Sequence, residues 1–249
     1  MLGMIRSVGA LGLAAGVTRA VYTGLRRRGD ERWRRTNHAG RTVDLCAGPA
    51  TAAGAVIGAL AAPVGRRERG AAVVAGLAAA VCGAYDDAHG DHRRGFRAHL
   101  GALRDGEVTS GAVKLFGIGA AGLVAGALLK ERPVDRVLAG VVVAGTAHFA
   151  NLVDVRPGRA VLTLLAVGVA GLPRGRLAAA PMGAAAAVAA DDLGERTMLG
   201  DAGAHALGAV LGTAIAASAG RTGLAVHAAG LVAAAACGGT VSRLAGSPG

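Results

Sequence analysis

Residues 111–129 read GAVKLFGIGAAGLVAGALL. This stretch is close to the roughly 20 apolar residues that an α-helix needs to cross a bilayer. Comparable stretches recur along the 249-residue chain, which is 53% hydrophobic and has a mean hydropathy of +0.47. Such a chain is too apolar for an ordinary soluble domain, so the sequence predicts an all-α, polytopic integral membrane protein.

About nine apolar segments are candidate transmembrane helices, and together they form a single helical domain over residues 1–249. The 42 glycines and the many alanines suit helix packing in lipid, because small side chains let backbones approach closely. The first segment is expected to remain as an anchor, since it lacks a small-residue cleavage site followed by a soluble domain. The segments lie at about 3–22, 46–64, 70–85, 111–129, 135–150, 160–172, 177–190, 202–219 and 223–241.

Four polar islands between these segments hold nearly every acidic residue and histidine. They are Asn37 to Gly48, Tyr85 to Gly106, His148 to Arg159 and Asp191 to His205. If each apolar segment crosses the bilayer once, all four islands lie on the same side as the C-terminus. That side also carries more Lys and Arg than the other, so the positive-inside rule predicts that the islands face the cytoplasm. Ionisable residues in repeated gaps between apolar segments are typical of the active face of a membrane protein.

The net charge of +11 does not indicate a nucleic-acid partner. Only 2% of the residues are aromatic, so bases would find no stacking platform. The arginines lie in gaps between segments, where they attract anionic lipid headgroups. Cys46, Cys82 and Cys237 are far apart and lack the spacing of metal ligands, so they are expected to be small buried hydrophobic residues.

The adjacent aspartates Asp86 and Asp87 suit the chemistry of phosphate transfer. At the end of a helix, one carboxylate can bind Mg²⁺ while the other accepts a proton or orients a nucleophile. Mg²⁺ normally shares its coordination with phosphate oxygens. This preference suits carboxylates that come singly from other loops, such as Asp154 and Asp201.

Basic and backbone groups beside the other two aspartates also favour a phosphate ligand. Arg156 and Arg159 follow Asp154, and guanidinium groups match phosphate oxygens bidentately. Asp201 follows Gly200 at the predicted start of a helix, where free backbone N–H groups and the helix dipole attract anions. Together these residues predict a metal-assisted site for a diphosphate at the membrane surface.

Each of these features also has a simpler interpretation. Adjacent aspartates at a helix end are usually solvated, and an aspartate before a helix usually caps it. Arginine-rich gaps usually determine topology, and a single histidine is usually structural. The placement of four separate acidic sites on one face is what favours the functional interpretation.

Three motifs carry a resemblance to a known family. Tyr85-Asp86-Asp87 is similar to its aspartate pair, Asn151-Leu152-Val153-Asp154 to the first half of its Asn-Leu-x-Asp-Gly-x-Asp-Gly loop, and Met198 to Gly203 with Ala206 to Gly208 to its Phe-Met-Gly-Asp-x-Gly-Ser segment. The chain thus resembles the polyprenyl-phosphate N-acetylhexosamine-1-phosphate transferases, which include the phospho-MurNAc-pentapeptide transferase and GlcNAc-1-phosphate transferases. The resemblance covers about residues 30–215, with a looser likeness at Asn37 to Gly48.

This resemblance implies a multi-pass protein of the bacterial plasma membrane, with about ten helices and cytoplasmic catalysis that depends on Mg²⁺ or Mn²⁺. In this family a lipid phosphate attacks a nucleotide-sugar diphosphate, and the product is a lipid-linked sugar for cell-envelope glycans. The sequence departs from the family in three places. Pro157 stands at the second aspartate of the loop, Gly90 stands where a lysine usually follows the aspartate pair, and the His-rich cytoplasmic loop has no counterpart.

The transferase interpretation assigns a role to each candidate residue. Asp201 and Asp154 would bind the metal, and Asp86 and Asp87 would be catalytic. The implied partners are a polyprenyl-phosphate carrier, a nucleotide-sugar, membrane lipids and a second copy of the chain in a homodimer. The substrate-binding candidates are Asn37, Lys114, Asn151, Arg156, Arg159, Gly200 and His205.

Two other function classes remain open. A catalytically silent relative could bind a lipid carrier or a partner membrane protein as a scaffold, and the departures at Pro157 and at the His-rich loop favour it. The retained aspartates argue against it, because acidic groups near lipid are costly. A transporter would need ionisable residues near the middle of its spans, where this sequence has hardly any.

Overall fold

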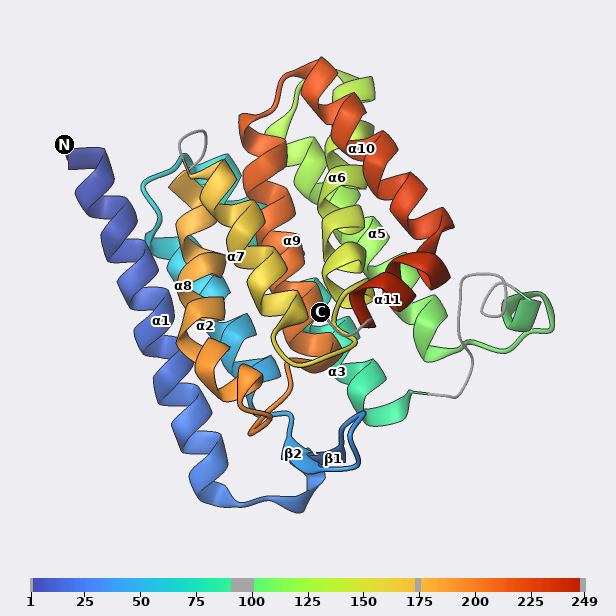
Figure 1. Ribbon diagram of the computed structural model, residues 1–249. Coiled ribbons are helices and arrows are strands. Elements are labelled where there is room, and N and C mark those ends of the chain that lie inside the picture. Colours follow the sequence, from blue (N-terminus) through green and yellow to red (C-terminus); the bar gives the residue numbers. More distant parts are fainter. Residues whose placement is uncertain (1, 91–100, 173–175, 247–249) are drawn as a thin grey trace.

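The computed structural model describes residues 2–90, 101–172 and 176–246. It is all-helical, with 81% of the residues in helices, and a two-stranded hairpin joins the first two helices (Figure 1). The helices are α1 (Leu2–Arg28), α2 (Ala47–Ala61), α3 (Arg66–His89), α5 (Ser110–Leu129), α6 (Pro133–Leu152), α7 (Arg159–Gly171), α8 (Ala179–Leu193), α9 (Gly200–Ser218), α10 (Arg221–Ala236) and α11 (Gly238–Gly246). The strands are β1 (Arg34–Thr36) and β2 (Thr42–Asp44), and short 3-10 helices cover Glu31–Trp33 and Arg176–Ala178.

Each predicted apolar segment coincides with a helix, but the last segment is broken. The chain turns by 81° between α10 and α11, next to Gly238 and Gly239. Glycine is a poor helix former, which favours a break at this position. The prediction that all three cysteines are buried is wrong for Cys237, which caps α10 at this turn and is exposed.

Among the described residues, three helices are long and apolar enough to cross a membrane. They are α1 from Ser7 onward, α3 and α5, and the bent pair of α10 and α11 would be a fourth if it forms one span. By contrast, α2 has 15 residues and α7 has 13, fewer than the roughly 20 that cross a bilayer without distortion. Nine crossings therefore remain a prediction.

The packing of the bundle brings small residues into close helix contacts and leaves many large apolar residues on the surface. Most of α9 is buried in the centre of the molecule, between α3, α6 and α2 (Figure 1). Gly83 lets α3 approach α9 so closely that a Cβ there would lie 2.4 Å from the backbone oxygen of Asp201. The side chains of Val81 and Val226 are instead 68% and 65% exposed. Close helix contacts at small residues, with large apolar side chains on the surface, suit a protein surrounded by lipid. In lipid, helices associate by close packing at small residues.

Direct contacts bring the four polar islands together at one end of the bundle, where Figure 1 shows the hairpin below α3 and α9. The N–H of Asp201 in the fourth island donates to Oδ1 of Asp87 in the second at 2.9 Å, and the N–H of Met198 in the fourth donates to the backbone oxygen of Asp44 in the first at 2.8 Å. The N–H of Gly158 in the third island donates to Oδ2 of Asp192 in the fourth at 2.8 Å. The described parts of the four islands thus lie at one end of the bundle, and the side of a membrane that this end faces stays a prediction. Residues 91–100 of the second island lie outside the described residues.

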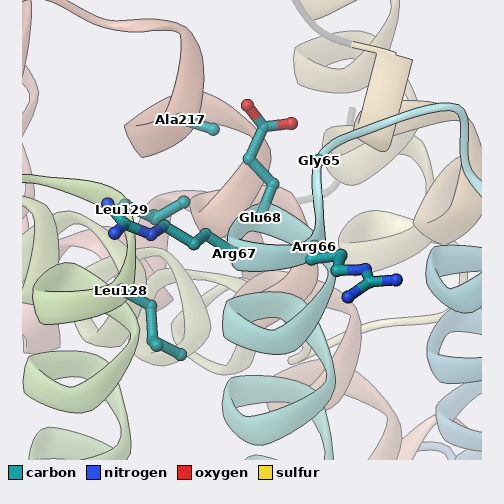
Figure 2. Close-up of a pocket in the computed structure, with 7 residues that line it drawn as sticks. All are labelled: Gly65, Arg66, Arg67, Glu68, Leu128, Leu129 and Ala217. Atoms are coloured by element: carbon teal, nitrogen blue, oxygen red, sulfur yellow. The ribbon is translucent and has the colours of Figure 1, made fainter.

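A surface pocket of about 300 Å³ lies at the opposite end of the bundle. It is formed by the first turn of α3 and the last turns of α5 and α9 (Figure 2). Figure 2 shows Arg66, Arg67 and Glu68 around its rim, with Leu128 and Leu129 on one wall. Because α3 runs from this pocket to the islands, the pocket is separate from the predicted site by the length of that helix.

Candidate functional site

Lys114 lies between two of the predicted site aspartates, each from a different helix. Its Nζ donates to Oδ2 of Asp86 at 2.6 Å and also to Oδ2 of Asp201. Asp86 is in the last turn of α3, Lys114 is near the start of α5, and Asp201 is in the first turn of α9. Their side chains are 18% to 21% exposed, so water screens these charges only in part. The site therefore begins with an ammonium group held by two carboxylates.

The first turn of α5 fixes the position of this lysine. Thr109 is the N-cap of α5, and its side chain accepts a hydrogen bond from the N–H of Ala112 at 3.2 Å. Threonine is a favoured N-cap because its oxygen satisfies one of the free N–H groups of the first turn. Ser110, the first residue of the helix, also interacts with Asp86 and favours its charged form. The start of α5 thus binds the end of α3 through two side chains.

Asp87 caps the N-terminus of α9 from a distance of more than one hundred residues along the chain. Its Oδ1 accepts from the N–H of Asp201 at 2.9 Å, and its Oδ2 accepts from the N–H of Ala202 at 3.0 Å. Gly200 makes this approach possible, because its φ is +60° and a Cβ there would lie 3.0 Å from Oδ1 of Asp87. Asp87 therefore positions Asp201, and Gly200 is required by backbone geometry at the place where it was predicted to contact substrate.

Asp154 lies in the turn that follows α6 and is half-buried. Burial raises its pKa well above the ordinary value, and the nearby carboxylates of Asp192, Asp201 and Asp87 raise it further. These interactions place Asp154 in the electrostatic field of the same cluster. The structure therefore brings all four predicted aspartates to one region.

Asp192 is a member of this cluster that the sequence interpretation missed. Asp192 is 3% exposed, and its Oδ2 accepts a hydrogen bond from the N–H of Gly158, just before α7. The sequence signal was present, because Asp191-Asp192 is a second pair of adjacent aspartates at a helix end. In both pairs one residue forms an ion pair, Asp86 with Lys114 and Asp191 with Arg19 and Arg196, while the other binds backbone N–H groups.

Asn37 is at the same end of the molecule but makes structural contacts. Its Nδ2 donates to Oε2 of Glu195 at 2.7 Å, and its Oδ1 accepts from the N–H groups of Ala39 and Arg41 at 2.9 Å. Arg41 also forms an ion pair with Glu195 at 3.3 Å. These contacts fasten the hairpin to the loop between α8 and α9. They do not join Asn37 to the Lys114 network.

Three further substrate-binding candidates lie around the loop after α6: Asn151 at the end of α6, Arg156 in the loop and Arg159 at the start of α7. The backbone oxygen of Asn151 accepts from the N–H of Asp154 at 3.1 Å, which forms the turn at the end of the helix. Arg156 and Arg159 flank Gly158, whose N–H binds Asp192. Contacts among the described residues do not join Arg156 to Lys114. Both arginines nevertheless lie within two residues of Gly158, which contacts the carboxylate cluster.

Two histidines lie beside the site. His205 is 2% exposed, and its Nδ1 lies 2.8 Å from the backbone oxygen of Asp201, to which it donates. His148 on α6 lies within electrostatic range of both Lys114 and His205, and it is exposed. The sequence interpretation placed His148 in a polar island but did not select it for the site.

The acidic groups fit a hard cation such as Mg²⁺ by their chemistry. The carboxyl groups of Asp86 and Asp201 lie within hydrogen-bonding range of each other and converge on one cationic nitrogen. In residues 2–90, 101–172 and 176–246, no three His, Cys, Asp or Glu side chains are arranged to hold a metal ion. Mg²⁺ commonly takes one or two protein carboxylates and completes its shell with water and phosphate oxygens. The pair therefore suits a cation that is bound together with a phosphate ligand.

The arrangement can hold an anion and its counter-ion at the junction of three helices. Lys114 offers a positive charge, while Asp86, Asp154 and Asp201 offer oxygen ligands from separate elements. Such a cluster of charged groups from separate elements can stabilise a bound ion electrostatically, and it can equally hold the helices together. Neither a model of a known protein family nor a curated protein sequence matches this chain.

Proposed function

We propose that the protein is a membrane phosphoglycosyltransferase, which moves a sugar-1-phosphate from a nucleotide diphospho-sugar to a polyprenyl phosphate. The observation that carries this proposal is the Lys114 network, in which Asp86 and Asp201 meet one ammonium group beside Asp87 and Asp154. The motif resemblance supports the same function, because these are the aspartates of its three motifs.

The residues of the site would divide the work of phosphoryl transfer between them. Lys114 and the arginines at 156 and 159 would neutralise the diphosphate, and Asp86 would position the attacking lipid phosphate. Asp87 would hold the start of α9, and thereby Asp201, in place. Asp201 and Asp154 would hold Mg²⁺ or Mn²⁺, and Asp86 would share the ion through the oxygen that meets Lys114. When bound, the ion would offset negative charge on the diphosphate and on the departing nucleoside monophosphate.

The proposed location is the plasma membrane of a bacterium, with about nine crossings and the site at the cytoplasmic surface. Three long apolar helices and an exterior rich in exposed valine and leucine support membrane insertion. The grouping of the islands at one end supports a single active face. The positive-inside rule then favours the cytoplasm for that face.

The proposal is tested with purified protein, Mg²⁺ and either undecaprenyl or decaprenyl phosphate. A panel of UDP-, GDP-, CDP- and dTDP-sugars is screened for release of the nucleoside monophosphate. We expect at least one sugar nucleotide to give release that needs the lipid carrier. The Asp201→Asn variant should lose about a hundredfold or more of this turnover, because it removes a charge that acts on the reacting phosphates.

A matched control for this variant lies at the opposite end of the bundle. Asp135 forms an ion pair with Arg221 at 2.7 Å, and Asp135→Asn makes the same chemical change far from the site. It should retain most of the turnover. Equal loss in both variants, or full activity in Asp201→Asn, would contradict the assignment.

The second candidate function is a catalytically silent scaffold that binds a lipid carrier. The observation that favours it is that both oxygens of Asp87 are already bonded to the backbone of α9, which a purely structural role would also explain. A scaffold would bind polyprenyl phosphate in a vesicle or detergent assay and release no nucleoside monophosphate. Binding of the carrier without any binding of the nucleotide-sugars would select this function.

A further inference from the structure

We propose that Lys114 holds the cation position between Asp86 and Asp201 and that Mg²⁺ must displace it, so that this lysine sets the metal affinity and couples it to phosphate binding. The inference rests on the proposed function for the identity of the ion and of the anionic ligand. It adds a role for Lys114 in the site before any ligand is bound.

The geometry makes the ammonium group and a divalent cation competitors. Nζ of Lys114 bonds Oδ2 of Asp86 and Oδ2 of Asp201, and it occupies the point where these two oxygens meet. Two cations that seek the same partly buried oxygens repel each other, and the repulsion is strong where water screens poorly. A metal ion can therefore reach both carboxylates only if the ammonium group leaves.

Neighbouring groups confine this exchange to one pair of carboxylates. Asp87 is a poorer replacement site, because each of its oxygens already accepts a hydrogen bond, from the N–H groups of Asp201 and Ala202. Asp154 lies within electrostatic range of Asp201, and a divalent cation there would stabilise its carboxylate form more than a monovalent cation would. A divalent ion is therefore bound more strongly than the ammonium group would be, and its position is the one between Asp86 and Asp201.

The displaced lysine has a natural partner in a bound phosphate. Its flexible four-carbon stem starts near the beginning of α5, so the ammonium group can turn toward an anion beside the carboxylates. A phosphate ligand would thereby lower the cost of displacing Lys114. Metal and phosphate should then bind with positive coupling, and by linkage each should strengthen the other equally.

The experiment measures Mn²⁺ binding by the full chain in detergent, using electron paramagnetic resonance, with and without inorganic pyrophosphate. Lys114→Met removes the competitor, so it should bind Mn²⁺ about tenfold more tightly than the natural protein when pyrophosphate is absent, the equivalent of one charge-assisted hydrogen bond. Pyrophosphate should tighten Mn²⁺ binding in the natural protein and do so much less in the variant. Lys114→Arg keeps the charge and should retain weak binding.

The result that would overturn the proposal is Mn²⁺ binding that is unchanged or weaker in a folded Lys114→Met variant. Absence of Mn²⁺ binding in every form would overturn it as well. If Lys114→Met does not fold, Lys114→Gln carries the same expectation, because it keeps a hydrogen-bond donor without the charge. Tighter metal binding by the variant would uphold the exchange even if no sugar nucleotide is a substrate, so the two proposals fail separately.

Discussion

At the scale of single residues, Asp154 combines burial with a strongly acidic neighbourhood. Both effects raise its pKa above that of an unfolded aspartate, about 3.9. The folded protein therefore binds more protons than the unfolded chain, so this residue favours folding below the unfolded pKa. That contribution is lost as the pH rises through the folded pKa.

Because the pKa of Asp154 is raised in the folded protein, Asp154→Asn should become more stable than the natural protein at high pH. The neutral amide avoids the cost of a buried charge, so the two proteins should converge near pH 4 and diverge as the pH rises above it. Thermal unfolding in detergent, with a chelator to exclude metals, measures the difference. Identical pH profiles for the two proteins would contradict the placement of Asp154 in the acidic cluster.

A second prediction at this scale concerns Arg156 and Arg159. If these side chains bind the diphosphate, Arg156→Ala and Arg159→Ala should each weaken nucleotide-sugar binding by about 1.5–3 kcal/mol, the range for hydrogen bonds to charged groups. Asp86→Asn should lower turnover with little effect on that binding. Isothermal titration separates the two cases, and unchanged affinity in both arginine variants would remove them from the site.

At the scale of secondary structure elements, the contact between α3 and α9 positions the site. Asp87 satisfies two N–H groups of the first turn of α9, which have no partner within the helix. Asp87→Ala should therefore lower the free energy of unfolding by about 0.5–2 kcal/mol, the range for loss of a helix cap. Asp87→Asn keeps one acceptor oxygen and should lose less. Equal unfolding transitions in denaturant for Asp87→Ala and the natural protein would show that the cap contributes nothing.

The helices and their order could be predicted from the sequence, whereas the role of each aspartate could not. Apolar stretches between charged gaps indicate helices by length and composition alone, and alternation of direction brings the gaps to one end. Adjacency does not reveal which member of Asp86-Asp87 faces a neighbouring helix. That choice depends on the close approach at Gly83 and on the left-handed backbone of Gly200. The same ambiguity hid Asp192.

Asn37 shows a further limit of sequence interpretation. The first island was expected to face substrate, but it forms a hairpin whose turn is closed by the Asn37 side chain. Its partner Glu195 is more than one hundred residues away along the chain and adopts a positive φ of 52°. No periodic pattern marks such a pair, because the contact depends on how two loops meet at the end of the bundle.

At the scale of the whole molecule, charged residues gather at the two ends of the bundle. One end gathers the hairpin, the aspartate cluster and the loop after α6, and the other carries the pocket lined by Arg66, Arg67 and Glu68. Apolar helices with many exposed valines and leucines join the two ends. A reaction between a lipid-borne phosphate and a water-soluble nucleotide needs such a boundary, where a polar site lies at the end of lipid-facing helices.

The most direct test of the transferase proposal follows a labelled phosphorus atom from donor to lipid. In the proposed reaction an oxygen of the lipid phosphate attacks the β-phosphorus of the nucleotide-sugar, and the bond from that phosphorus to the bridging oxygen breaks. With a donor labelled at the β-phosphorus, the label should move into the organic-extractable lipid while unlabelled nucleoside monophosphate is released. Asp201→Asn should abolish this transfer, and Asp135→Asn should retain it. Label that stays in the aqueous phase across the whole panel of sugar nucleotides and carriers would contradict the account.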